Sequence, residues 1–288
     1  MRLIAPIFAL LAAAAGPARS QDDPLVDRYK QFFRDSIAPT WSSTEASEMR
    51  VVMLRGFERH DVPDAAEWLL AEVVAGSDAA DEVRAALDML AAYTRPETVT
   101  RTAELWDKRI RKPAERRALG VLAFRGKKGE AAVEALREGL DDRDPRVARA
   151  ACQVAGESLR RELLEPIRKL LDSREPVVRG AAALALAELS DEESLPALLR
   201  MFCGEDSHRA RHDVWLALRK LSREELPCRP TAWEEWWSKQ RGEVAEGETS
   251  PWGDSFPRVH SSAAEPGMFF GIPVLADRVI IVLDTSQS

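Results

Sequence analysis

The pattern of apolar and polar positions predicts a chain built mostly from amphipathic helices. Apolar, Ala-rich stretches recur at residues 83–87, 118–122, 147–155, 178–189 and 214–218. Stretches with leucines at helical spacing lie between them, at 68–70, 132–136, 163–171 and 195–202. Apolar residues three and four positions apart share one side of a helix, so each neighbouring pair of stretches predicts a helix–turn–helix unit.

These units repeat with a regular period. Arginines stand 34, 32, 63 and 32 residues apart, at Arg50, Arg84, Arg116, Arg179 and Arg211. The interval of 63 is two periods, and its midpoint lies next to Arg149. Prolines follow the same period at Pro113, Pro145 and Pro176. We expect each proline to open a helix, because its missing N–H would be unpaired in the first turn anyway, and Ser207 to cap the next helix.

Two segments carry a family resemblance. Residues 144–151, Asp-Pro-Arg-Val-Ala-Arg-Ala-Ala, and residues 175–183, Glu-Pro-Val-Val-Arg-Gly-Ala-Ala-Ala, resemble HEAT repeats. In both segments an acidic residue precedes the proline, where it suits the positive end of a helix. The resemblance covers residues 44–222 and implies an α-solenoid, in which stacked hairpins bury one continuous core and leave an extended surface for docking. We interpret the recurring arginine as a structural rung that reaches an acidic group or helix carbonyls in the next repeat.

Segments on either side of the repeats are predicted to close their ends. Apolar residues along 24–36 predict a helix within an N-terminal cap at 21–43. Residues 223–240 predict a Trp-rich capping helix, because Trp233 and Trp237 lie four positions apart and share one side. We interpret this helix as a lid over the last repeat, with a carbohydrate- or peptide-binding aromatic patch as the alternative. Residues 241–267 are rich in Gly, Glu, Ser and Pro without periodicity, which predicts an interdomain linker.

A different pattern occupies residues 277–288. The unbroken apolar run at 279–283 predicts a strand buried on both faces, as in parallel sheets. Asp284, Ser286 and Ser288 follow it at alternate positions. Ligands bind beyond the carboxyl ends of the strands in open α/β sheets, and hard cations such as Mg²⁺ prefer oxygen ligands. The sequence therefore predicts a metal site that uses one carboxylate and two hydroxyls.

This C-terminal segment resembles the start of a von Willebrand factor A (VWA) domain. The run VIIVLDTSQS is similar to the first strand and Asp-x-Ser-x-Ser metal loop of that family, and residues 269–274 are similar to the lead-in before it. Gln287 stands where the family often has Gly. The resemblance implies that residues 268–288 are the truncated start of an α/β domain. In the complete domain, later loops add a Thr and an Asp to the metal site. We therefore expect Mg²⁺ to be held well only by the complete domain. The alternative is an apolar tail that docks on helices and binds no metal.

Residues 1–20 resemble a secretory signal peptide. Arg2 precedes an apolar run that is short for a membrane span, and small residues precede Gln21. We expect an exported protein, periplasmic or at the cell surface, without a membrane span after cleavage. Removal of Arg2 and Arg19 leaves 39 basic residues against 48 acidic ones. This acidic balance argues against nucleic acid as a partner, because phosphate-binding surfaces are positively charged.

The sequence offers little for catalysis. His208 and His212 have the spacing of two metal ligands on one helix, but no third ligand is visible, and we interpret them as solvated. Three cysteines, Cys152, Cys203 and Cys228, are too few for a disulfide framework, although Cys203 and Cys228 could pair in an oxidising compartment. No nucleophile-elbow, P-loop or dinucleotide-binding motif occurs. The sequence therefore indicates a protein that is not an enzyme.

These patterns favour an exported, non-catalytic interaction or adhesion protein. Its HEAT-like solenoid would dock proteins, and its VWA-like domain would bind a protein ligand through Mg²⁺ held by Asp284, Ser286 and Ser288. A plain HEAT-repeat scaffold without a metal site is the alternative. A third interpretation is the non-catalytic part of an enzyme, since HEAT-like repeats also occur in bilin lyases. The sequence identifies neither the partner nor the oligomeric state.

Overall fold

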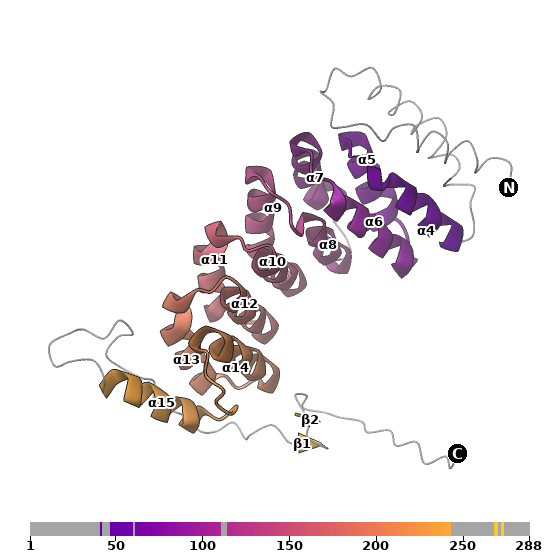
Figure 1. Ribbon diagram of the computed structural model, residues 1–288. Coiled ribbons are helices and arrows are strands. Elements are labelled where there is room, and N and C mark those ends of the chain that lie inside the picture. The colour runs from indigo at the N-terminus through magenta and orange to yellow at the C-terminus, as the bar shows by residue number, and fades with distance from the viewer. Residues whose placement is uncertain are drawn as a thin grey trace, which may run out of the picture. The chain divides into compact units, whose positions relative to one another are not determined.

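The chain is mainly helical, as the apolar pattern predicts (Figure 1). The computed structural model describes Trp41 and residues 47–59, 61–110, 114–242, 268–269 and 272–273. The chain divides into two compact units, Met1–Ser158 and Leu159–Ser288. The predicted signal peptide, the helix at 24–36, the strand and metal loop at 277–288 and all but the first two residues of the linker lie outside the described residues.

Helices of the first unit pack in two layers (Figure 1). One layer holds α4 (Ser47–Arg55), α6 (Ala80–Ala92), α8 (Ala114–Val121) and α10 (Pro145–Glu157). The other layer holds α5 (Pro63–Trp68), α7 (Pro96–Arg109) and α9 (Glu130–Leu140). A π-helical turn at Leu69–Val74 continues α5, and a 3-10 turn at Leu122–Phe124 continues α8. Each hairpin thus contributes one helix to each layer, which is the arrangement of helical repeats.

Apolar side chains fill the space between these two layers. Trp106 of α7 meets Phe124 edge to face, with ring centroids 6.2 Å apart, and both side chains are buried. Small residues allow close approach: a Cβ added to Gly139 of α9 would lie 3.1 Å from the Cβ of Ala151 in α10. The prediction that small residues let the helices stack closely is confirmed here.

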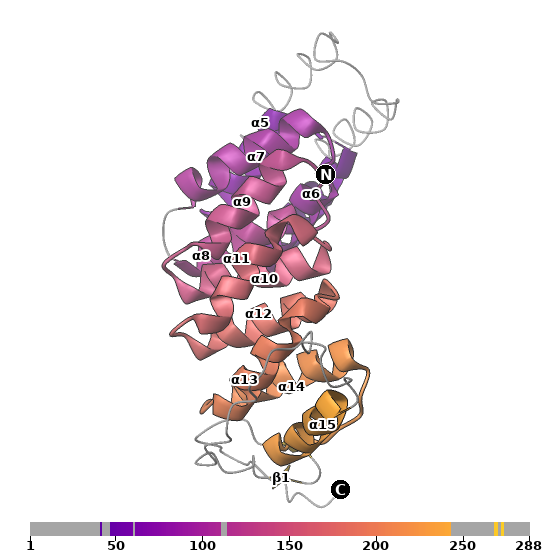
Figure 2. The same cartoon turned by 90° about the vertical axis from the view of Figure 1, so that its left-hand side faces the viewer.

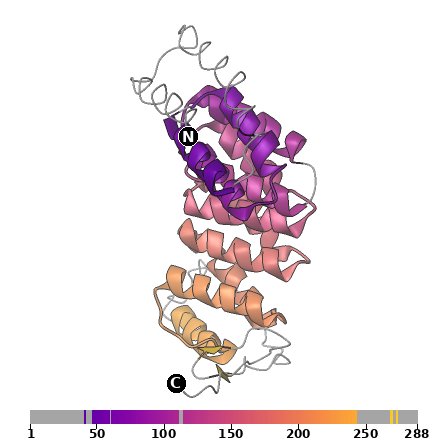
Figure 3. The same cartoon turned by 90° about the vertical axis from the view of Figure 1, so that its right-hand side faces the viewer.

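The second unit uses the same arrangement (Figures 1 and 2). One layer holds α11 (Leu164–Lys169), its 3-10 extension η6 (Leu170–Asp172) and α13 (Leu195–Gly204), which follows the 3-10 turn η7 (Glu192–Ser194). The other layer holds α12 (Pro176–Glu188) and α14 (His208–Ser222). At the closest approach of α12 and α14, a Cβ on Gly180 would lie 2.8 Å from the Asp213 carboxylate. The last described helix, α15 (Pro230–Gly242), packs against α13. Figures 2 and 3 show it beside the repeat helices of this unit.

The predicted helix starts are confirmed where the structure describes them. Pro145 and Pro176 occupy the first turns of α10 and α12. Asp144 caps α10 by accepting a hydrogen bond from the Arg146 N–H, and Ser207 caps α14 in the same way through Ala210. Glu175, in contrast, makes no side-chain cap on α12. The residue type before the proline therefore decides whether the exposed N–H groups find a side-chain acceptor.

Backbone conformation repeats at the ends of the helices. The turns that follow α8, α10, α12 and α14 each contain a left-handed residue: Gly126 (φ 70°), Leu159 (φ 52°), Ser190 (φ 53°) and Arg223 (φ 61°). A left-handed residue after a helix allows the next N–H groups to bond back to its last carbonyls. Three of these four positions lack glycine, so they carry a backbone cost that the surrounding turn must offset.

Beyond Gly242 the structure describes two short strands. β1 (Met268–Phe269) and β2 (Ile272–Pro273) pair antiparallel, with Phe269 opposite Ile272. They lie in the segment that resembles the VWA lead-in, and the α/β domain itself stays a prediction. No helix among the described residues is both long and apolar enough to cross a membrane.

Candidate interaction surface

The sequence-predicted metal residues Asp284, Ser286 and Ser288 lie outside the described residues, so the site they would form stays a prediction. Within the described part of the chain, no group of three or more His, Cys, Asp or Glu side chains is arranged to hold a metal ion. His212 packs against Trp215 instead, with ring centroids 5.3 Å apart. Partial burial lowers the pKa of His212, and the nearby Asp213 opposes that shift. His212 is thus a partly buried side chain that packs on Trp215.

The two buried cysteines have thiols of low reactivity. Cys152, Cys203 and Cys228 form no disulfide, and the first two are buried. Burial raises the pKa of Cys152 and of Cys203 to about 12, which leaves little reactive thiolate near neutral pH. The pairing of Cys203 with Cys228, left open by the sequence, is not formed in this structure.

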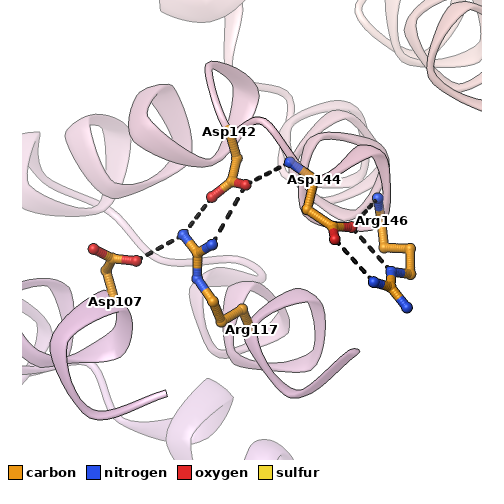
Figure 4. A network of polar contacts seen from close by, with 5 residues as sticks. All are labelled: Asp107, Arg117, Asp142, Asp144 and Arg146. Carbon is orange, nitrogen blue, oxygen red and sulfur yellow. Dashed lines mark hydrogen bonds and ion pairs between the residues drawn. The ribbon is translucent and has the colours of Figure 1, made fainter. Parts of the chain in front are cut away.

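Ion pairs connect successive repeats in the first unit (Figure 4). The Arg117 guanidinium of α8 lies between two carboxylates, donating to Asp107 at 2.7 Å and to both oxygens of Asp142. Asp142 in turn accepts the N–H of Asp144 at 2.8 Å. Asp144 then caps α10 and pairs with Arg146. One arginine therefore fixes the turn that presents the cap of the next helix.

The predicted arginine rung is only partly confirmed in this unit. Arg50 lies 3.7 Å from the buried Glu82 carboxylate of the next hairpin, as expected. Arg116, however, reaches back to the preceding hairpin, donating to the Val74 carbonyl at 3.4 Å and to Asp78 at 3.3 Å. Its neighbour Arg117 makes the forward contact. The repeat period places the arginine to within one residue, but it cannot say which side of α8 faces forward.

The second unit contains a similar arginine–carboxylate pair, with a more deeply buried carboxylate. Arg179 of α12 donates to the two Glu205 carboxylate oxygens at 2.6 and 2.7 Å, and to the Ser173 carbonyl at 2.7 Å. Glu205 also accepts the Ser207 N–H at 3.0 Å, just as Asp142 accepts that of Asp144. The hydrogen bonds to Glu205 raise the pKa of Arg179.

Arg168 of α11 forms a second fixed point in this unit. It donates to the Asp191 carboxylate at 2.8 Å and to Glu193 at 2.7 Å. Burial opposes ionisation of Asp191, but the hydrogen bonds from Arg168 and Ser194 outweigh it and lower the pKa. The turn that leads into α13 is thereby tied to α11.

An open groove of about 570 Å³ lies between the Arg168–Asp191 and Arg179–Glu205 ion pairs. Leu171 and Asp172 of η6 line one side, and Ala197, Arg200 and Met201 of α13 line the other. Its volume falls within the range of about 300–1,000 Å³ that is usual for ligand sites in proteins. The paired arginines Arg168 and Arg179 also line this groove, so its walls are held in place by ion pairs.

The solvent-facing side of α13 differs from that of α9, the corresponding helix of the first unit. In α13 the residues that are not fully buried are Pro196, Ala197, Arg200, Met201 and Gly204. In α9 they include four charged residues, at positions 130, 134, 137 and 138. A helix surface that faces only water is normally charged or polar. The solvent-facing surface of α13 is therefore smaller and more apolar than that of α9.

Unpaired charges lie at the same groove. Arg200 is exposed and makes no ion pair or hydrogen bond with the rest of the described chain, in contrast to Arg168 and Arg179. Asp172 and Asp206 are likewise exposed without an ion pair to any described residue. Among the described residues, the groove thus combines the exposed side chains of Arg200, Asp172 and Asp206 with the adaptable Met201 side chain.

The Trp-rich helix α15 follows the repeats of the second unit. Trp233 and Trp237 are almost fully buried, as expected of a lid, and Trp233 meets Phe202 of α13 at 6.2 Å. The Trp233 indole N–H donates to the Pro227 carbonyl at 3.0 Å. Trp236 is only half-buried, so the exposed aromatic side chain is not one of the two that the helical spacing singles out.

A buried lysine was missed by the sequence interpretation, which treats Gly126-Lys127-Lys128-Gly129 as a simple turn. Lys127 is buried and donates to the carbonyls of Ala91, at 3.1 Å, and of Tyr93 at the end of α6. Burial lowers its pKa to about 8, and the charge of Asp61 opposes the shift. The clue in the sequence is the position of the lysine, one period after the end of α6, where it meets unpaired helix carbonyls.

Comparison with known protein families supports the HEAT-like interpretation for part of the chain. Residues 133–219 match a family model described as HEAT repeats. This match covers α9 to α14, including the groove beside α13. A search of curated proteins finds no match. HEAT repeats commonly mediate protein interactions, so this part of the chain is a helical repeat scaffold suited to protein binding.

Proposed function

We propose that this chain is an exported, non-catalytic scaffold whose helical repeats dock a partner protein in the groove beside α13. The groove carries the proposal. Its walls are fixed by Arg168 and Arg179, and its α13 side is apolar apart from the unpaired Arg200. Protein interfaces are typically enriched in Met and Arg, and Met201 and Arg200 both line this groove. The acidic balance of the chain supports a protein partner over nucleic acid.

A peptide-display selection tests the docking site even though the partner is unidentified. Peptides selected on the whole chain are measured by calorimetry against wild type, Arg200→Glu and Ala197→Gln. Both substitutions lie in the groove and are expected to weaken binding by at least about tenfold, since a central Arg contact is often worth over 1 kcal/mol. Arg137→Glu on the charged side of α9 is the matched control and should leave affinity unchanged. Equal losses for Arg137→Glu and Arg200→Glu would place the binding site elsewhere.

The finer part of the proposal concerns Mg²⁺. Asp284, Ser286 and Ser288 supply a carboxylate and two hydroxyl oxygens, a donor set that suits a hard cation, and they follow a strand-like apolar run. Bound there, Mg²⁺ would supply a positive charge that can take an acidic side chain of a protein ligand. Asp284 would hold the ion, and the two serines would orient it. A plain scaffold with no metal site is the alternative.

Two measurements test these finer points. Calorimetric titration of the natural gene product, including any residues that follow Ser288, should detect Mg²⁺ binding that Asp284→Ala removes. Heat effects unchanged by Asp284→Ala would favour the plain scaffold. For export, residues 1–20 fused to a reporter enzyme that folds only outside the cytoplasm should yield activity, and a fusion that begins at Gln21 should not.

A further inference from the structure

A second, smaller pocket of the second unit lies between the start of α13, the end of α14 and α15. Its volume is about 230 Å³. That is below the usual range of about 300–1,000 Å³ for a whole drug-sized ligand, and it suits a single large side chain. The pocket does not share a residue with the groove beside α13.

Aromatic and aliphatic side chains line the inside of this pocket. Leu195, Leu221 and Trp237 are buried and form its fixed part, while the half-buried Trp236 closes one side. Trp236 is held against Trp233 and Trp237, with ring centroids 5.6 and 6.2 Å away. Because these rings are already ordered, an apolar side chain can enter without the cost of ordering a flexible surface.

The Trp236 indole N–H is a further sign that the pocket is incomplete. It is buried and has no hydrogen-bond acceptor among the described residues. The Trp215 and Trp233 N–H groups of the same unit donate to the carbonyls of Leu226, at 2.8 Å, and of Pro227, at 3.0 Å. A buried donor without an acceptor costs stability, and the residue that carries it lines the pocket.

Charge at the rim defines the ligand more closely. Arg223 lines the pocket, is exposed, and its side chain makes no ion pair or hydrogen bond within the described chain. The preceding cations of α14 are paired, Arg219 with Glu225 and Lys220 with Glu188. Arg223 also adopts a left-handed backbone conformation, φ 61°, which holds its side chain at the end of α14. Among the described residues, the pocket therefore places an unpaired guanidinium next to two leucines and two tryptophans.

We propose that this pocket binds the C-terminal residue of a partner polypeptide. The apolar side chain of that residue occupies the space between Trp236 and the two leucines. Its terminal carboxylate pairs with Arg223, whose planar fork suits both carboxylate oxygens. Glu192, which lines the pocket and has no ion pair with a described residue, is available to accept the N–H of the same terminal residue.

A C-terminal apolar residue fits this pocket better than an internal residue of a polypeptide would. An internal apolar residue brings no charge to Arg223, and an internal acidic residue brings no side chain that fills an apolar pocket. Within a polypeptide, only the C-terminal residue carries an apolar side chain and a carboxylate on the same Cα atom. Recognition of terminal carboxylates is an established mode of peptide binding.

Three hexapeptides that end in Leu, Ile or Phe test the proposal, each made as the free acid and as the C-terminal amide. Affinities are measured by fluorescence polarisation on the full chain. At least one acid should bind roughly tenfold more tightly than its amide, the scale expected of a charge-assisted hydrogen bond. Arg223→Gln should remove that difference and leave the amide affinity unchanged. Arg200→Gln, in the other groove, should change neither, which separates this site from the docking groove.

Several results would overturn the inference. Equal binding of acid and amide, or an unchanged difference in Arg223→Gln, would show that the terminal carboxylate does not contact Arg223. Absence of binding by all three acids at millimolar concentration would show that the pocket does not take a chain terminus. Tighter binding by a peptide with an added residue after the apolar one would assign an internal segment instead. Trp236→Leu, which keeps an apolar side chain, should weaken acid and amide alike, and failure to do so would remove the pocket from the site.

Discussion

The Arg179 guanidinium holds the Glu205 carboxylate through two parallel hydrogen bonds of 2.6 and 2.7 Å. The Glu205 side chain is only 1 % exposed, while that of Arg179 is 20 % exposed. Glu205 therefore depends on this arginine for a compensating charge. The same carboxylate orients the Ser207 N–H, so the pair sets both the spacing of α12 and α14 and the start of α14.

Replacement of Arg179 should destabilise the chain strongly. In Arg179→Met, Glu205 stays buried without a cation, and loss of one partner of a buried pair costs about 3 kcal/mol. The double variant Arg179→Met/Glu205→Leu should lose less, because no buried charge is left uncompensated. Urea unfolding monitored by circular dichroism measures both.

The matched control for this pair is Arg137→Met. Arg137 pairs with Glu134 on α9, but both side chains are well exposed. Exposed pairs contribute at most about 0.5 kcal/mol when they lie one helical turn apart. If Arg179→Met unfolds at the same urea concentration as Arg137→Met, the buried pair is not a stabilising element.

The helical framework could be predicted from the sequence because its signals are local. Proline and cap residues mark the starts of α10, α12 and α14, and Ala-rich stretches mark their lengths. The sequence analysis does not predict helix α7, because residues that the structure buries in it look polar in the sequence. Its buried Thr98 and Thr102 look polar in the sequence, yet the Thr102 hydroxyl donates to the Thr98 carbonyl at 2.8 Å and is thereby satisfied inside the core.

The candidate sites were harder to predict because they depend on which charges find partners in three dimensions. Arg179 and Arg200 are both arginines on helices, and only the structure shows that one is paired and the other is not. Trp236 and Trp237 are neighbours, and helical spacing favours the buried one. Lys127 can be buried because its ammonium group donates to the Ala91 carbonyl. The residues around Lys127 in the sequence do not reveal this distant acceptor.

Asp144 should contribute through its charge as well as its position. Its side chain caps α10, and its hydrogen bonds with Arg146 lower its pKa to about 2. Asp144→Ala should cost about 1 kcal/mol at neutral pH, as expected for loss of an N-cap. Glu175→Ala is the control, because Glu175 precedes α12 without capping it, and its effect should be much smaller.

The pH dependence of the Asp144 contribution follows from the direction of this shift. A carboxylate whose pKa is lower in the folded state stabilises that state above its unfolded pKa, near 3.9. The stabilisation is lost as the pH falls from about 4 toward 2. The difference in unfolding free energy between wild type and Asp144→Asn should therefore shrink over this range. A difference that stays constant between pH 5 and pH 2.5 would show that the charge of Asp144 plays no part.

Lys127 also predicts stability that rises with pH, but in a higher pH range and because deprotonation removes a buried charge. Its pKa falls to about 8 in the folded chain, chiefly through burial, against about 10.4 in an unfolded chain. Between these values the unfolded state binds more protons, so the free energy of unfolding should rise with pH. Urea titrations between pH 7.5 and 9.5 should show this rise for wild type and a flatter profile for Lys127→Met.

The adjacent lysine supplies the control. Lys128 is exposed, so Lys128→Met should keep the wild-type rise with pH. Measurements stop at pH 9.5 because the buried Tyr93, whose pKa is raised by burial, opposes the trend at higher pH. A flat profile for wild type itself would contradict the assignment of Lys127 as a buried, partly deprotonated group.

The left-handed turns predict opposite effects for the same substitution at two glycines. A Cβ added to Gly126 or to Gly204 meets no atom within 4 Å, so packing is equal at the two positions. Gly126, however, has φ 70°, where a side chain costs about 1–2 kcal/mol, whereas Gly204 ends α13 without a positive φ. Gly126→Ala should therefore destabilise by about 1 kcal/mol, and Gly204→Ala should be neutral or stabilise by up to about 1 kcal/mol.

Leu159 extends the comparison to a residue with a side chain, because it is 65 % exposed and has φ 52°. Leu159→Gly should raise the thermal midpoint by relieving the cost of this left-handed backbone conformation. Destabilisation by Leu159→Gly as large as that by Gly126→Ala would mean that contacts of the leucine side chain outweigh its backbone conformation.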